Sequence, residues 1–214
     1  MTIHNQNSSI LFFNGTIYGS AKSSAILCRD GKITAVGKKD DFTIENSIDL
    51  DGGFVFPGFI DSHLHLLGAG QALENLNFTG FISPDEVAES VKNTTNNVRR
   101  NGNWILGRGW DQTLWKNQIY PDKSILDVVA PDIPVVLRRV DGHALWANTK
   151  AMELAGISQD TFTPDGGIIY KNTRGEPSGI FIDNAMNLIL NVIPKPKKSD
   201  IKRQLIKAMS HLNS

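Results

Sequence analysis

The sequence predicts an α/β chain, and three observations support this fold class. Short stretches of strand character separated by turn residues fill the first fifty residues. An apolar run that ends in two histidines, FVFPGFIDSHLHL, covers residues 54–66. Beyond it, segments with helical spacing alternate with short apolar strands. The length of 214 residues allows one or two domains.

The first fifty residues predict a β unit of about four strands. Asn14-Gly15 and Asp30-Gly31 lie between candidate strands, and both dipeptides supply the positive φ that tight hairpin turns need. A further short strand, 48–50, leads toward the apolar run. The other expected strands cover 10–13, 16–18, 25–28 and 32–36.

The apolar run is expected to continue as a strand over 57–66. Successive side chains of a strand point to opposite faces, so Asp61, His63 and His65 would share one face. Neutral imidazole is a common zinc ligand, which makes His63 and His65 candidate metal ligands. Asp61 is expected to orient an imidazole or the end of the strand. Taken alone, the pair also fits a structural strand whose wet face carries two histidines.

The remaining chain predicts helices and strands in alternation. Ser83-Pro84-Asp85-Glu86 combines a serine cap, a proline at the first helical position and a glutamate placed for a capping box. This pattern predicts a helix over 84–101. The other expected elements are strands at 104–106 and 133–140, a helix at 149–155, a hairpin of 168–171 with 179–182, and helices at 184–192 and 200–212.

Composition excludes some classes of partner. Lysine plus arginine equals aspartate plus glutamate at 22 each, so no net field attracts nucleic acid or an anionic membrane. No run of 18 apolar residues is present, and we expect no signal peptide because the first residues lack a basic region and a long apolar run. The single cysteine, Cys28, agrees with a reducing compartment. We therefore expect a cytoplasmic protein without a nucleic-acid or membrane partner.

Several phrases resemble one known family. PGFIDSHLH, at 57–65, is similar to the first barrel strand of the amidohydrolase superfamily of metal-dependent hydrolases. GRGWDQTLW at 107–115, PVVLRRVDGHALWANTKAMELAGI at 134–157 and GGIIYKNTRGEPSGIFIDNAMNLI at 166–189 resemble its type 3 branch, which includes N-substituted formamide deformylases. The resemblance covers nearly the whole chain, from about residue 10 onward.

The resemblance implies a domain organisation. Residues 1–56 would form the N-terminal half of a small β-sandwich domain. Residues 57–214 would contain the first strand of an incomplete (β/α)8 barrel at 57–66, an α+β insertion subdomain over 80–195 and a final helix. A full barrel needs about 250 residues, so the chain is expected to be an N-terminal fragment.

The resemblance also implies a chemistry, the hydrolysis of carbon–nitrogen bonds other than peptide bonds in a small amide, N-formyl or N-acyl amine. One or two divalent ions, zinc above all, would bind to His63 and His65, with Asp183 as a further candidate ligand. The metal would activate a water molecule and polarise the carbonyl. The family's usual catalytic aspartate lies in later barrel strands and is missing from this sequence.

Four more residues are candidates for substrate binding, each with a structural alternative. His143 follows an apolar strand and the Asp141-Gly142 pair, and it would be a substrate contact or a general acid in a cleft, or else a surface or capping histidine. The same alternatives apply to Asp141. Trp110 and Asp111 would form a pocket wall, or Trp110 would be a buried core residue. Asp183 itself would bind metal, or cap the helix that follows it.

Two functional hypotheses remain open at this level. In the first, the chain is a fragment of a hydrolase, or a hydrolase whose missing barrel part is supplied by a separate chain; a homo-oligomer is the other expected partner. Alternatively, the chain is a non-catalytic remnant or binding module that retains the insertion fold.

Overall fold

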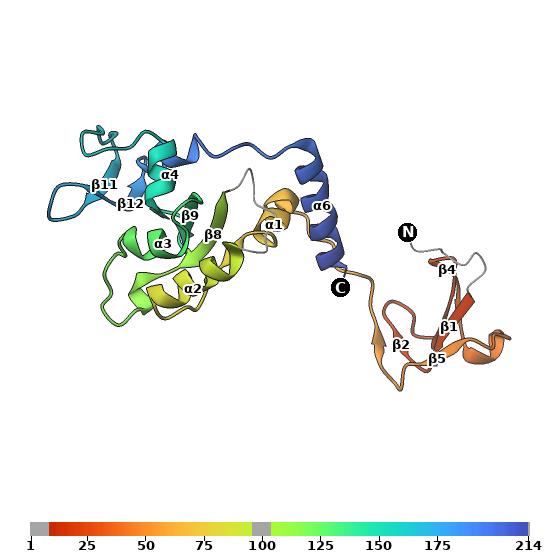
Figure 1. Ribbon diagram of the computed structural model, residues 1–214. Helices are drawn as coiled ribbons and strands as arrows, with labels where there is room; N and C mark the ends of the chain where they lie inside the picture. Colours follow the sequence, from red (N-terminus) through yellow and green to blue (C-terminus); the bar gives the residue numbers. More distant parts are fainter. Residues whose placement is uncertain (1–8, 96–103, 214) are drawn as a thin grey trace. The chain divides into compact units, whose positions relative to one another are not determined.

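The computed structural model describes residues 9–95 and 104–213, and the chain divides into two compact units after Leu64 (Figure 1). The sequence predicts a boundary after residue 56, at the start of the expected barrel strand. Each unit has its own sheet and its own buried core. The units are therefore described separately.

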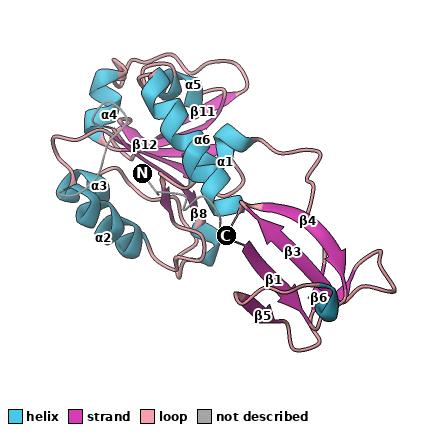
Figure 2. Cartoon of the chain, turned by 90° about the vertical axis from the view of Figure 1, so that its right-hand side faces the viewer, coloured by secondary structure: helices cyan, strands magenta, loops and turns pink. Residues whose placement is uncertain are grey.

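The first unit is a small β structure whose strands are visible in Figure 2. One sheet has the order β4-β3-β1-β5, and β2 pairs with β6 in a second, two-stranded sheet. Leu11, Ala25 and Leu27 are buried between the strands and form its core. The elements are β1 (Ser9–Phe13), β2 (Thr16–Ile17), β3 (Ala25–Arg29), β4 (Lys32–Gly37), the 3-10 helix η1 (Lys39–Asp41), β5 (Ser47–Asp49) and β6 (Phe54–Val55).

The two predicted turns of this unit behave differently. Asp30 and Gly31 have positive φ and connect β3 to β4 as an antiparallel hairpin, as predicted. Asn14 also has positive φ, but β1 and β2 do not pair, so the predicted hairpin is wrong. Asn14 Nδ2 instead donates to Asp49 Oδ1 at 2.7 Å. The turn directs the chain from one sheet to the other.

The expected strand over 57–66 is not formed. Regular strand geometry ends with β6 at Val55, where this strand pairs in parallel with β2. The following residues up to 65 are neither strand nor helix, and the side chains of Phe59 and Ile60 are almost fully exposed. A strand needs backbone partners beside it, and the described residues offer none here. An apolar sequence alone was insufficient to make the strand.

The second unit is built on a six-stranded sheet in the order β11-β12-β10-β9-β8-β7. Strands β7, β8 and β9 run parallel, whereas β10 is antiparallel to both β9 and β12. The strands are β7 (Leu76–Asn77), β8 (Ile105–Trp110), β9 (Val135–Arg139), β10 (Ala144–Ala147), β11 (Gly167–Lys171) and β12 (Pro177–Asp183). The helices are α1 (Leu66–Ala72), α2 (Pro84–Thr95), η2 (Gln112–Leu114), α3 (Ser124–Val129), α4 (Thr149–Leu154), α5 (Met186–Leu190) and α6 (Lys198–Leu212).

Alternation along the strands gives this sheet two apolar faces. One face packs against α2 and α3 through a cluster that includes Leu126, Leu137 and Trp146. The other packs against α4 and α5 through a cluster that includes Met152 and Phe181. The result is a sheet with a helical layer on each face, the arrangement expected when both faces of a sheet are hydrophobic.

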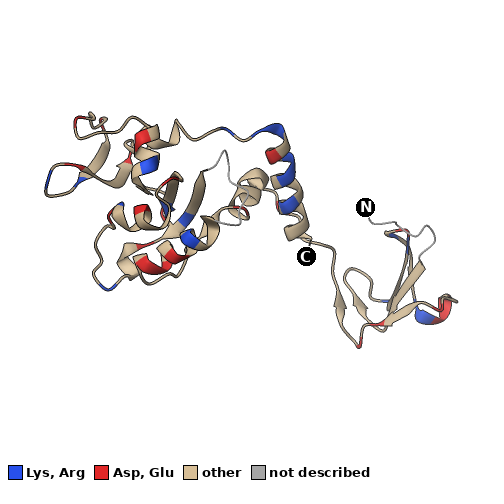
Figure 3. Ribbon diagram, viewed as in Figure 1, with Lys and Arg blue, Asp and Glu red and all other residues tan. Residues whose placement is uncertain are grey.

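Helices α1 and α6 pack against each other at a very close approach. A Cβ atom added to Gly70 would lie 2.2 Å from the backbone oxygen of Gln204. Beside this contact, Arg203 Nε donates to Glu74 Oε1 at 2.8 Å, and this bond holds the pKa of the Glu74 carboxyl below its ordinary value. Figure 3 shows that Lys and Arg residues are frequent along α6.

Most predicted elements of this unit are present, with shifted ends. The helix predicted over 84–101 is α2, of which residues 96–101 lie outside the described residues. Its start is as expected, because Ser83 Oγ accepts the N–H of Glu86 at 3.2 Å. Strands β7 and β10 and helices α1 and α3 were not predicted. All four are short, between two and seven residues.

Candidate functional site

The sheet of the second unit gathers polar residues at one edge. Because β8, β9 and β12 run in the same direction and β10 runs opposite, the ends of the first three strands meet the start of β10. Five charged or titratable residues lie at this edge, and we call them the polar edge: Asp111, Arg139, Asp141, His143 and Asp183.

His143 and Asp183 form a hydrogen-bonded pair within the polar edge. His143 Nδ1 lies 2.8 Å from Asp183 Oδ1, and the backbone N–H of Asp183 donates to the carbonyl of His143 at 3.0 Å. The two side chains remain 72% and 51% exposed. A carboxylate that accepts from Nδ1 fixes the neutral imidazole with Nε2 as an acceptor. The pair can therefore accept a proton from, or bind, a group arriving from solvent.

The other three residues of the polar edge hold the segment before His143. Asp141 Oδ1 accepts the backbone N–H of His143 at 3.0 Å, and Asp141 Oδ2 lies 3.1 Å from Arg139 Nη1. Arg139 Nη2 is also 3.8 Å from Asp111 Oδ1. Asp111 is fixed in turn because its Oδ1 accepts from both the N–H and the hydroxyl of Thr113. One network of contacts thus connects three strand ends.

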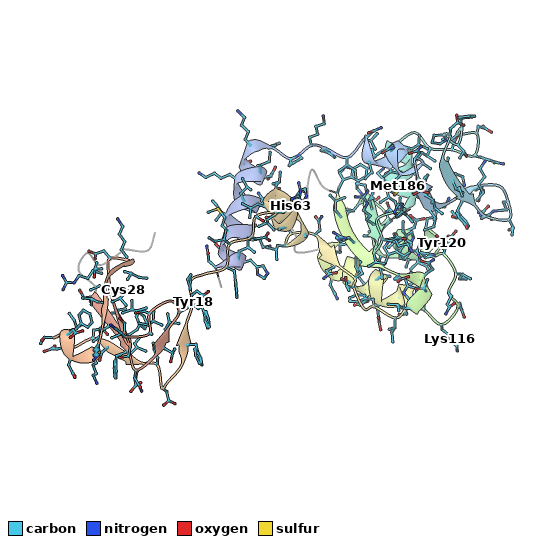
Figure 4. All side chains as sticks on the ribbon, turned by 180° about the vertical axis from the view of Figure 1, so that it is seen from behind. Tyr18, Cys28, His63, Lys116, Tyr120 and Met186 are labelled. Carbon is cyan, nitrogen blue, oxygen red and sulfur yellow. The ribbon has the colours of Figure 1, made fainter. Side chains whose placement is uncertain are left out.

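Trp110 does not form a pocket wall, which corrects the prediction. Its side chain is completely buried, and its Nε1–H donates to the carbonyl of Leu137 at 2.9 Å. It packs against Trp115, Trp146 and Tyr120, the last of which is labelled in Figure 4. The register of β8 is irregular between Arg108 and Trp110, and this irregularity places the ring in the same buried cluster as Ile105. The core alternative is the correct one for Trp110.

Asp183 does not cap a helix. Helix α5 begins after Ala185, and Asp183 ends β12 with a positive φ of 49°. A non-glycine residue in this region of φ is uncommon and is tolerated best by Asp and Asn. This conformation accompanies the bond to His143, so the side chain belongs to the polar edge rather than to the helix.

The two histidines of the apolar run lie on either side of the boundary between the units. His63 belongs to the first unit, and its backbone N–H donates to Asp61 Oδ1 at 2.9 Å. Asp61 thus contacts the main chain of His63. His65 is the N-cap residue of α1 and is exposed, as is His63, which is labelled in Figure 4.

A complete metal site is not assembled within the described residues. Among residues 9–95 and 104–213, no group of three or more His, Cys, Asp or Glu side chains is placed to hold a metal ion. A catalytic zinc ordinarily has three protein ligands and a water molecule. His63 and His65 therefore supply, at most, part of such a site.

Sequence reasoning missed Arg139 as a member of the polar edge. The available signal was its position in β9, since Val135 and Leu137 share its face of the strand and are both fully buried. An arginine that continues a buried face needs carboxylate partners nearby. The neighbouring Arg138, on the opposite face, donates from Nε to the carbonyl of Gly142 at 3.2 Å.

A separate hollow of about 310 Å³ lies at the opposite end of the strands. It is open to solvent and is bordered by residues from α3, α4, the start of β12 and the connecting loops, among them Lys123, Glu153 and Glu176. None of the residues of the polar edge borders it.

No helix of the described chain has the length and apolar character needed to cross a membrane.

Comparison with known proteins relates this chain to one family of hydrolases. The profile of the Amidohydrolase family matches residues 46–214. The chain is 34% identical to the Bacillus subtilis protein YtcJ, an amidohydrolase by name, over 88% of this chain and 36% of the relative. It is 32% identical to the N-substituted formamide deformylase of Arthrobacter pascens over 78% of this chain and 32% of that enzyme.

The fold is also shared with a solved structure. An uncharacterized metal-dependent hydrolase from Pyrococcus furiosus superposes with a TM-score of 0.66 at 28% identity, and the match covers 95% of this chain and 42% of that chain. The chain thus spans about a third of the length of the relatives named above.

Proposed function

Because the chain belongs to the amidohydrolase family, we propose that it takes part in the metal-dependent hydrolysis of a carbon–nitrogen bond other than a peptide bond. The substrate would be a small amide, N-formyl or N-acyl amine. The observation that carries the proposal is the family match over 46–214, which includes both the His63-Leu64-His65 segment and the polar edge.

We propose His63 and His65 as metal ligands and zinc as the ion, one or two in number. Imidazole nitrogen suits zinc among the common divalent ions, and two histidines separated by one residue can reach one ion. Asp183 is a further candidate ligand, but its Oδ1 is bonded to His143. Asp183 would therefore bind through Oδ2 or release His143.

The described residues fit only part of a metal site, so the remaining ligands would come from elsewhere. A further segment, a separate chain carrying the rest of a barrel, or a second copy of this chain are the candidate sources. We also propose that this chain forms part of a β-sandwich domain and part of a (β/α)8 barrel. Within the chain, we propose that His143 and Asp141 contact the substrate, with Asp111 supporting them through Arg139.

Metal binding is the direct test of the proposal. The purified chain is dialysed against zinc and its metal content is compared with that of a His63→Ala, His65→Ala double variant. We expect the double variant to lose binding, whereas His211→Ala, which removes another exposed histidine on α6, should bind as the wild type does. Equal zinc content in all three proteins would contradict the assignment of the ligands.

A second candidate function is a non-catalytic binding module that retains the fold of the second unit. Turnover separates the two functions. Metal-dependent release of formate or acetate from N-formyl or N-acyl amines by this chain would exclude the binding module.

A further inference from the structure

We infer that Arg139 is a positioning residue that holds the His143–Asp183 pair in place without touching it. The inference rests on the proposed function for what the pair does, and on the geometry of the second unit for how the pair is held. Arg139 was not a candidate from the sequence.

Arg139 is fixed from several directions. Its terminal nitrogens lie 3.1 Å from Asp141 Oδ2 and 3.8 Å from Asp111 Oδ1. Its Cζ atom lies 5.9 Å from the centre of the Tyr120 ring. Its Nε is buried and has no hydrogen-bond partner within the described part of the chain. With only 19% of the side chain exposed, these charge interactions are screened less than those of a surface pair.

Through its contact with Asp141, Arg139 also restricts the position of His143. One oxygen of Asp141 meets Arg139, and the other accepts the backbone N–H of His143 at 3.0 Å. Gly142, between them, has a φ of 82° and would otherwise allow this segment many conformations. Arg139 therefore selects one conformation of the turn, the one that places the imidazole 2.8 Å from Asp183.

The tautomer of His143 provides a spectroscopic test that needs neither metal nor substrate. Asp183 contacts the ring, and the charged residues on the same turn as His143 are Asp141, Arg138 and Arg139. At about pH 8.5, where an ordinary imidazole is neutral, a bond to Asp183 selects the form with the proton on Nδ1. Two-bond proton–nitrogen correlations of the ¹⁵N-labelled full chain measure the ratio of the two tautomers.

The informative variants are Arg139→Gln and Asp141→Asn. Asp141→Asn keeps a side-chain oxygen that can accept the N–H of His143, but it loses the negative charge that attracts Arg139. We expect the Nδ1-protonated to Nε2-protonated ratio to fall about fivefold in both, the change that corresponds to about 1 kcal/mol. Arg174→Gln, which removes an exposed ion pair with Glu176 on the β11–β12 turn, should leave the ratio unchanged.

Each outcome decides the question. A wild-type ratio in either variant overturns the inference, and Asp141→Asn alone decides it if Arg139→Gln fails to fold. A fall in the ratio in the first two variants but not in Arg174→Gln supports it. Failure of the proposed function is seen separately, as absence of zinc binding or of hydrolysis in a wild-type chain whose tautomer ratio still favours Nδ1.

Discussion

Asn148 is expected to be among the most sensitive positions of the second unit. Its side chain is fully buried and makes four hydrogen bonds to the main chain. Oδ1 accepts the N–H groups of Val135 and Ala151, both at 3.0 Å. Nδ2 donates to the carbonyls of Ala130 and Ile133, both at 2.9 Å. One side chain thus connects β9, the end of α3 and the start of α4.

The substitution Asn148→Ala would leave these four backbone groups without that partner, three at buried positions and that of Ile133 at a partly buried one. An unsatisfied buried group costs about 1–3 kcal/mol, so three or four groups at the lower limit give a destabilisation of about 3–4 kcal/mol. Few single substitutions reach this value. The second unit would then retain only a small part of the stability that is typical of a domain.

Urea unfolding followed by tryptophan fluorescence measures this change in the second unit specifically. All four tryptophans of the sequence, at 104, 110, 115 and 146, belong to that unit. Asn172→Ala is the matched control, because Asn172 makes three hydrogen bonds in the β11–β12 turn but is partly exposed. There water can replace the lost partner, and we expect a loss of about 1 kcal/mol.

The comparison has a clear negative result. If Asn148→Ala lowers the free energy of unfolding by no more than Asn172→Ala does, burial does not set the cost of these bonds and the reasoning is wrong. A change in the slope of free energy against urea concentration would show that the unfolded or native state had changed as well.

Two further predictions concern the contact between α1 and α6. Gly70→Ala should separate the two helices and destabilise the second unit, because the new Cβ would lie 2.2 Å from the carbonyl oxygen of Gln204. Gly68→Ala on the same helix has room for a Cβ and should stabilise α1 by about 0.5–1 kcal/mol. Circular dichroism during urea unfolding distinguishes the two variants. The pKa of Glu74 is lowered by Arg203, so its contribution is present at neutral pH and lost as pH falls through the folded value, below about 4.5. Glu74→Gln should remove this part of the acid sensitivity, and an unchanged pH profile of unfolding would refute the assignment.

The sequence predicted the strands and helices of both units better than their pairing. Turn residues marked the β3–β4 and β11–β12 hairpins correctly, since each is a local structure with its own positive-φ residue. Asn14 has the same local conformation, yet the chain continues into another sheet. Local residues set the φ of a turn, whereas the partner of the next strand depends on distant residues.

Four of the five residues of the polar edge were candidates from the sequence, but their arrangement was not predicted. Asp111, Asp141, His143 and Asp183 were each identified one at a time, and the structure brings them to one edge of a sheet. Their connection was not readable, because it depends on the order of the strands and on Arg139. The roles of His63 and His65 remain predictions, since the strand expected to align them is not formed.

The strand order has a consequence for how the polar edge is made during folding. Arg139, Asp141 and His143 come from one short stretch of chain and can approach one another as soon as β9 and β10 pair. Asp183 is 40 residues from His143 and arrives only when β12 has docked on β10. Closing that longer loop costs more chain entropy, so we expect the imidazole to meet its carboxylate late, after the centre of the sheet has formed. A nascent or partly unfolded chain would then carry His143 without its acid partner.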